Sequence, residues 1–171
     1  MIKLDEISLQ RGNKFLLEQA SAAFHPGQKI ALIGANGTGK SSLFQLLLGN
    51  LQSDDGTVSI PAHWRIAHMA QEVGTSTRNA LDYIIDGDLI LRAIEAEIVE
   101  AEQSDNLHQL AVLHEKLDTI DGYNARVRAE QLLQGLGFTI ADAAKPVNSF
   151  SGGWRIRLNL AQALMSPSDL L

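Results

Sequence analysis

The sequence predicts an α/β fold with an antiparallel β ribbon at its N-terminus and an inserted α-helical subdomain. Three patterns in its 171 residues support this prediction. A short apolar run at 30–33 ends at a glycine-rich stretch, and apolar residues at helical spacing follow. Near the N-terminus, apolar and polar residues alternate as they do in half-buried strands. From residue 77 almost to the end, apolar residues recur at helical intervals.

The first two predicted strands form the ribbon, at 2–9 and 15–24. In the first of them, isoleucine and leucine alternate irregularly with polar residues, which still favours a strand with one buried face. The run Gln-Arg-Gly-Asn at 10–13 is a turn signal between the two strands. A second turn at 25–28 leads to the apolar run at 30–33, which we predict to be a buried central strand.

Residues 34–41 fit the pattern G-x-x-x-x-G-K-[ST] between the predicted strand and a helix. Holding a polyphosphate needs many hydrogen-bond donors at once, and backbone N–H groups curled around the anion supply them. Gly34, Gly37 and Gly39 allow this close approach and the positive φ angles of such a curl. The helix that starts near Lys40 directs the positive end of its dipole at the same anion. The pattern therefore predicts a P-loop that binds a nucleotide.

Two side chains of this loop have predicted roles in phosphate chemistry. Lys40 supplies a full positive charge to the β and γ oxygens, and the Ser41 hydroxyl is a ligand for Mg²⁺. The competing interpretation is a glycine-rich turn before an ordinary helix, but the flanking strand and helix favour nucleotide binding. The predicted nucleotide contacts are Gly34, Asn36, Gly37, Thr38, Gly39, Lys40, Ser41 and Ser42.

The segment after this helix predicts two short strands. Glycine and polar residues at 49–56 indicate a loop, and 57–60 and 64–69 are predicted strands on either side of Pro61. Gln71 follows the second of these strands directly. Taken alone, Gln71 is interpreted as a solvated residue at a strand end.

The remaining periodicity predicts the helices of the subdomain. A short helix at 80–85 has possible N-caps at 75–77 and closes at Gly87. Amphipathic stretches at 90–101 and 107–117, separated by a break at 104–106, predict an antiparallel helical hairpin, and another helix runs from 123 to 136. Acidic residues outnumber basic ones between 86 and 130. This charge favours a solvated face, and a partner-binding arm is the alternative.

The composition argues against several classes of protein. Apolar residues make up 45% of the chain, enough for a substantial core, and no apolar run approaches the roughly 18 residues of a membrane span. The N-terminus lacks the apolar core of a signal peptide. Without cysteine there is no disulfide framework, thiol nucleophile or zinc ribbon, and the histidines form no ligand pattern. A net charge of −6 gives no support for nucleic-acid binding, so we expect a cytoplasmic protein without specific DNA binding.

A second layout suited to anions lies near the end of the chain. Ser151, Gly152 and Gly153 stand at the start of a predicted helix, where a hydroxyl, free N–H groups and the helix dipole meet without side-chain obstruction. The competing interpretation of this pattern alone is an ordinary capped helix with a flexible entry.

Taken together, the P-loop, Gln71, the helical insert and the sequence FSGGW at 150–154 resemble an ATP-binding cassette. FSGGW is similar to the signature motif LSGGQ of that family, altered at both ends. Gln71 matches the family glutamine that reaches Mg²⁺ and the attacking water. The resemblance therefore implies that Lys40 and Gln71 are catalytic. It also implies that Ser41 and Gln71 are ligands of Mg²⁺. The run WRIRLNLAQAL at 154–164 resembles the first cassette of the ABC-F subfamily.

The resemblance implies a function for the parent protein. ABC-F proteins are soluble ATPases with two cassettes in tandem, and many act on the ribosome as translation factors. ATP and Mg²⁺ are therefore the expected cofactors, and a second cassette and the ribosome are the expected partners. The signature residues Ser151, Gly152 and Gly153 are expected to contact nucleotide bound to the opposite cassette. The alternative function is that of a nucleotide-binding subunit of a membrane transporter.

The chain also departs from the family pattern. The family places an aromatic residue for adenine stacking before Gly12, where this chain has Arg11. A guanidinium plane can also stack on a base, and Phe15 is nearby, so Arg11 and Phe15 are alternative candidates for the base-stacking residue. The sequence ends where the family's Walker B strand begins, so the resemblance implies a fragment with negligible ATPase activity of its own. We predict three divisions: a nucleotide-binding core at 1–76, a helical subdomain with the signature at 77–165, and the start of the Walker B strand at 166–171.

Overall fold

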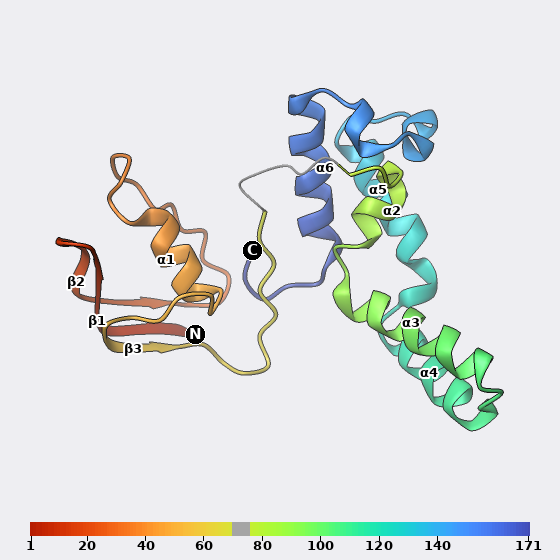
Figure 1. Ribbon diagram of the computed structural model, residues 1–171, viewed down its shortest axis with the longest axis horizontal. Helices are drawn as coiled ribbons and strands as arrows, with labels where there is room; N and C mark the ends of the chain where they lie inside the picture. Colours follow the sequence, from red (N-terminus) through yellow and green to blue (C-terminus); the bar gives the residue numbers. More distant parts are fainter. Residues whose placement is uncertain (70–75) are drawn as a thin grey trace. The chain divides into compact units, whose positions relative to one another are not determined.

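The computed structural model describes residues 1–69 and 76–171, which belong to two compact units (Figure 1). The first unit is Met1–Ile66 with Leu170, and the second is Ala67–Asp169 with Leu171. The first contains β1 (Ile2–Arg11), β2 (Lys14–Phe24), α1 (Lys40–Leu47) and β3 (Asp55–Ser59). The second contains α2 (Ala80–Ile85), α3 (Leu89–Gln103), α4 (Leu107–Thr119), α5 (Ala125–Gly135) and α6 (Gly152–Met165), with short 3₁₀ turns η1 (Gly122–Asn124), η2 (Ile140–Ala144) and η3 (Val147–Ser149). The predicted division at residue 77 stays a prediction.

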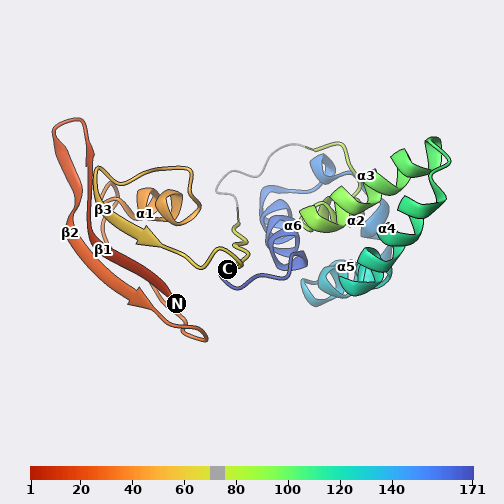
Figure 2. The ribbon, with the colours of Figure 1, turned by 90° about the horizontal axis from the view of Figure 1, so that it is seen from below.

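The strands of the first unit form an antiparallel sheet in the order β2-β1-β3, which confirms the predicted ribbon (Figure 2). Helix α1 packs its apolar side on this sheet, because only there can its leucines leave water. The buried contact consists of Ile2, Leu4, Ile7 and Leu9 from β1 with Leu46 and Leu47 from α1.

The irregular alternation in β1 has a structural cause. Leu4 and Ile7 are three residues apart, yet both are buried in the same core. Between them the ladder to β2 shifts its register, and Glu6 has a positive φ of 49°. This bulge takes up the extra residue, so the apolar side chains before and after it share one face. The Glu6 N–H donates to the Ser21 hydroxyl at 2.9 Å, which satisfies a group that the bulge removes from the ladder.

Gly56 in β3 lies directly against this bulge. Its φ is +76°, and a Cβ atom built on it would lie 2.4 Å from the carbonyl oxygens of both Asp5 and Glu6. Those contacts are with backbone, which cannot rotate away as a side chain can. The bulge in β1 therefore requires glycine at the opposing position of β3.

The helices of the second unit share one core, and α3 and α4 form the predicted antiparallel hairpin (Figures 1 and 2). The largest fully buried side chains here are Ile84, Leu91, Leu113, Val147 and Leu158. The N-cap of α2 is Asn79, whose side chain accepts from the Asp82 N–H at 2.8 Å. The predicted caps at 75–77 are wrong, because the helix begins only at Ala80 and a cap must directly precede the first helical residue.

The predicted strand at 30–33 is also wrong. None of these residues is in a strand, and the side chain of Ile33 is 90% exposed. An extended segment becomes a strand only when its N–H and C=O groups pair with a neighbour. Among the described residues, the three strands pair with one another and none pairs with this segment.

The prediction of a strand at 64–69 fails for a similar reason. Ile66 makes a single parallel bridge with Leu170, and the Leu170 N–H donates to the Arg65 carbonyl at 3.3 Å. One bridge does not extend into a ladder. The strand predicted at 57–60 is confirmed at 57–59, because β3 begins at Asp55 and ends at Ser59.

We expect Gly56→Ala to destabilise the chain by about 2–4 kcal/mol, because the substitution adds a backbone clash to an unfavourable φ. Gly49→Ala is the matched control: its φ is +74°, but nothing lies within 4 Å of the added Cβ. Thermal denaturation of both variants measures the difference. Equal losses in the two variants would show that the close approach to β1 contributes nothing.

Candidate functional site

The glycine-rich loop ahead of α1 has the curled backbone that its sequence predicts. Gly37 and Gly39 have positive φ angles of 77° and 94°, and Gly39 is the N-cap of α1. No side chain caps this helix, so its first N–H groups stay available to a ligand. The Thr38 hydroxyl donates to the Ala35 carbonyl at 2.9 Å and braces the curl from within. The loop thus presents free donors and the positive end of a helix dipole at one place.

Lys40 reaches back across this loop. Its Nζ donates to the carbonyl oxygens of Gly34 and Ala35, at 2.8 and 2.7 Å. These partners are neutral, and a phosphate oxygen would accept a stronger, charge-assisted bond from the same ammonium. Ser41, the next residue, is exposed at the start of α1 and offers a hydroxyl oxygen of the kind that Mg²⁺ prefers.

The structure also places a residue beside the loop that the sequence motif does not contain. Lys14, at the start of β2, donates from Nζ to the Gly37 carbonyl at 3.1 Å. Two residues further along the strand, Leu16 lies close to Gly39: a Cβ atom built on Gly39 would be 3.0 Å from the Leu16 side chain. The end of the β1–β2 hairpin therefore lies against the P-loop. No sequence motif indicates this contact, since it follows from the folding of the ribbon.

The signature residues lie at the N-terminus of α6, in the second unit. Ser151 is the N-cap, its side chain accepts no capping hydrogen bond, and Ser151, Gly152 and Gly153 are all exposed. A Cβ on either glycine would meet nothing within 4 Å. This helix start is thus sterically open to a ligand.

The two altered ends of the signature motif pack on one buried ring. Phe138, 4% exposed, makes edge contacts with Phe150 and Trp154, with ring centroids 5.6 and 4.7 Å apart. The Arg157 guanidinium lies 4.8 Å over the Trp154 ring and donates to the Leu136 carbonyl at 3.1 Å. Phe150 and Trp154 therefore hold the motif from both sides, with Ser151 to Gly153 exposed between them.

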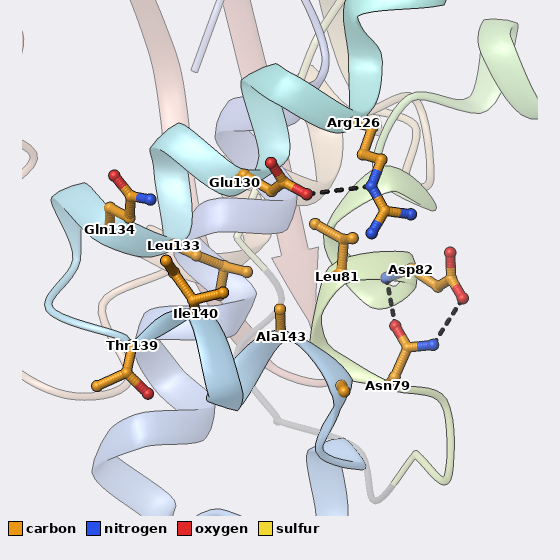
Figure 3. Close-up of a pocket in the computed structure, with 11 residues that line it drawn as sticks. Asn79, Leu81, Asp82, Arg126, Glu130, Leu133, Gln134, Thr139, Ile140 and Ala143 are labelled. Carbon is orange, nitrogen blue, oxygen red and sulfur yellow. Dashed lines mark hydrogen bonds and ion pairs between the residues drawn. The ribbon is translucent and has the colours of Figure 1, made fainter.

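A pocket of about 330 Å³ in the second unit lies between α2, α5 and η2 (Figure 3). Leu81 and Leu133 are among its apolar lining residues, and four of its polar side chains form two pairs. The Arg126 Nε donates to the Glu130 carboxylate at 3.0 Å, and the Asn79 amide donates to Asp82 at 2.8 Å. Because these partners are already paired, the pocket does not offer the concentrated donors of a phosphate site.

Gln71, predicted to be catalytic and a metal ligand, lies outside the described residues. Within the described ranges, 1–69 and 76–171, no group of three or more His, Cys, Asp or Glu side chains is placed to hold a metal ion. Over the same residues, none of the helices combines the length and apolarity needed to cross a bilayer.

A sequence profile described as "ABC transporter" matches residues 17–171, a range that contains the P-loop and the helical unit just described. The chain belongs to the ABC transporter family. It is 45% identical over 171 residues to the probable ATP-binding protein YheS of Escherichia coli K12, covering 100% of this chain and 27% of that protein. It is 32% identical over 178 residues to human ATP-binding cassette sub-family F member 3, covering 99% of this chain and 24% of that protein.

These similarities confirm the predicted likeness to ABC-F cassettes. The chain spans about a quarter of the length of these curated relatives. Among solved structures, the ADP- and Pi-bound dimer of the ATP-binding cassette MJ0796 matches with a TM-score of 0.63 and 18% identity, over 96% of this chain and 69% of that one. A structure titled as the ATP-binding subunit of an ABC transporter matches with a TM-score of 0.65 and 17% identity, over 96% and 61%. The likeness confirms the predicted α/β cassette fold.

We expect Phe138→Ala to destabilise the cassette by about 3–5 kcal/mol, because it removes the buried ring that both ends of the signature motif contact. Ile140→Ala, two residues away, is the control, since that side chain is 82% exposed and should cost under about 0.5 kcal/mol. Urea denaturation followed by tryptophan fluorescence in a Trp64→Phe background, where Trp154 is the only tryptophan, reports on this cluster. A loss below about 1 kcal/mol in the Phe138→Ala variant would contradict the bracing role.

Proposed function

We propose that this cassette binds Mg-ATP through residues 34–42 and belongs to an ABC-F ATPase. One observation carries the proposal: the P-loop curls through two glycines with positive φ into the uncapped N-terminus of α1, and Lys40 lies across it. Backbone donors, dipole and ammonium converge there, as binding a triphosphate requires. The similarity to YheS and to sub-family F member 3 supports ATP as the nucleotide.

Each residue of the proposed site has a distinct task. The N–H groups of Gly37 to Ser42 bind phosphate oxygens, and Lys40 exchanges its carbonyl partners for the β and γ oxygens. The exposed Ser41 hydroxyl fits Mg²⁺ as a hard oxygen ligand. When bound, the ion neutralises charge that develops on the phosphates during transfer. Gln71 is proposed to reach the ion and the attacking water.

For the full-length protein, we propose ATP hydrolysis that is coupled to a cytoplasmic partner. The ribosome is the proposed partner, and a second cassette in the same chain is the proposed neighbour of this one. The likeness to sub-family F member 3 supports this assignment over that of a transporter subunit. Ser151, Gly152 and Gly153 are proposed to cap nucleotide held by that second cassette.

We expect Lys40→Ala to abolish the stabilisation of this chain by Mg-ATP. For the unaltered chain, nucleotide at a hundred times its Kd should add about 2.7 kcal/mol to the free energy of unfolding, and the variant loses the ammonium that holds the phosphates. Thermal melts with and without millimolar Mg-ATP measure this. Lys3→Ala, which removes an equal charge from an exposed site in β1, should keep the full shift. If the unaltered chain is folded and Mg-ATP does not change its melting temperature, the proposed function is refuted.

In the full-length protein, Gly152→Asp should leave ATP binding at Lys40 nearly unchanged but abolish closure of the two cassettes. The site accepts a side chain sterically, since nothing lies within 4 Å of the added Cβ. The carboxylate would instead face a γ-phosphate, and like charges in a closed interface cost about several kcal/mol. Distance labels on the two cassettes measure closure, and Gly152→Asn separates charge from bulk. Lost ATP binding in the same cassette, with closure intact, would contradict the trans assignment.

A further inference from the structure

Two cations stand opposite each other at the end of the β1–β2 hairpin. Arg11 and Lys14 are paired residues of the antiparallel ladder, joined by a two-residue turn. Side chains in such a pair lie on the same face, about 4.5–5.5 Å apart at Cβ, and like charges there destabilise the sheet. Among the ion pairs of the residues that the structure describes, neither cation has a carboxylate partner. The hairpin thus concentrates positive charge that nothing in its own unit is seen to neutralise.

The pair lies on the face of the hairpin that contacts the P-loop. Lys14 shows this directly, because its Nζ is 3.1 Å from the Gly37 carbonyl oxygen. Since cross-strand partners share a face, Arg11 is on that face too. Phe15 is paired with Gln10, one position along the ladder, so alternation places it on the opposite face.

We propose that Arg11 and Lys14 form a second cationic subsite, which binds phosphate oxygens of the nucleotide held by the P-loop. This inference rests on the proposed function and extends it to two residues outside the loop motif. When the nucleotide is bound, Lys14 Nζ exchanges the neutral Gly37 carbonyl for an anionic oxygen, a stronger acceptor. The anion also relieves the repulsion between the two cations. Lys40 holds the carbonyls of Gly34 and Ala35, so positive charge reaches the loop from both the hairpin and the helix.

The test measures the affinity of this chain for two ligands, Mg-ATP and magnesium tripolyphosphate, which carries the phosphates without the base. Arg11→Gln and Lys14→Gln should each raise both dissociation constants about fivefold, the upper end of the range for an ion pair between exposed groups. Raising the salt from roughly 50 mM to 500 mM should shrink the difference from the unaltered chain, because the subsite is solvent-exposed. Lys3→Gln is the matched control on the same strand and should change neither constant.

Three outcomes would overturn the inference, and they have different meanings. Unchanged affinity in the Arg11→Gln/Lys14→Gln double variant, with binding still lost in Lys40→Ala, rejects the subsite and leaves the proposed function intact. A loss for Mg-ATP without any loss for tripolyphosphate would show that the hairpin contacts the base instead of the phosphates. No binding of either ligand by the unaltered, folded chain would reject the proposed function and this subsite together.

Discussion

The packing of α1 against β1 is the interaction on which the first unit depends. Each buried leucine or isoleucine in this contact contributes about 1.5–3 kcal/mol relative to exposure. Because α1 starts immediately after Gly39, the same contact fixes where the helix N-terminus lies and where the P-loop must curl. The bulge at Glu6 serves this packing, since without it the apolar residues on its two sides would face opposite directions. The geometry of the loop is thus set by a hydrophobic contact that includes no residue of the motif.

The second unit holds its exposed motif in a comparable way. The N-terminus of α6 is open at Ser151, Gly152 and Gly153. If this terminus were flexible, it would lose conformational entropy on binding a ligand, which would weaken the binding. Phe138 limits that cost, because Phe150 and Trp154 on either side of the motif both pack on its ring. The phenylalanine and tryptophan that distinguish this motif from LSGGQ are thereby explained as packing residues.

The sequence was most informative where function depends on local backbone chemistry. The P-loop, the start of α1 at Lys40 and the exposed glycines of α6 follow from spacing alone, because glycine conformations and helix ends are local properties. It was least informative where a partner elsewhere in the chain decides the outcome. Residues 30–33 have the composition of a buried strand, but among the described residues no strand pairs with them. Lys14 and Phe138 were missed for the same reason, since their importance comes from contacts with Gly37 and Trp154 that no motif encodes.

The two phosphate-type layouts differ in charge, and this difference bears on their proposed roles. At the P-loop, Lys40 and Lys14 both donate hydrogen bonds to neutral carbonyls, so both can bind an anion without losing an ion pair. At the start of α6, Arg157 lies over the Trp154 ring and donates to the Leu136 carbonyl, and the partly buried Arg155 follows the motif, whereas the exposed Ser151, Gly152 and Gly153 offer only a hydroxyl and backbone N–H groups. Neutral donors bind a hydrated triphosphate weakly, because they must replace its water with bonds of similar strength. The P-loop is therefore suited to capture nucleotide from solution. The signature is suited to add contacts to nucleotide that another site already holds, as its proposed trans role requires.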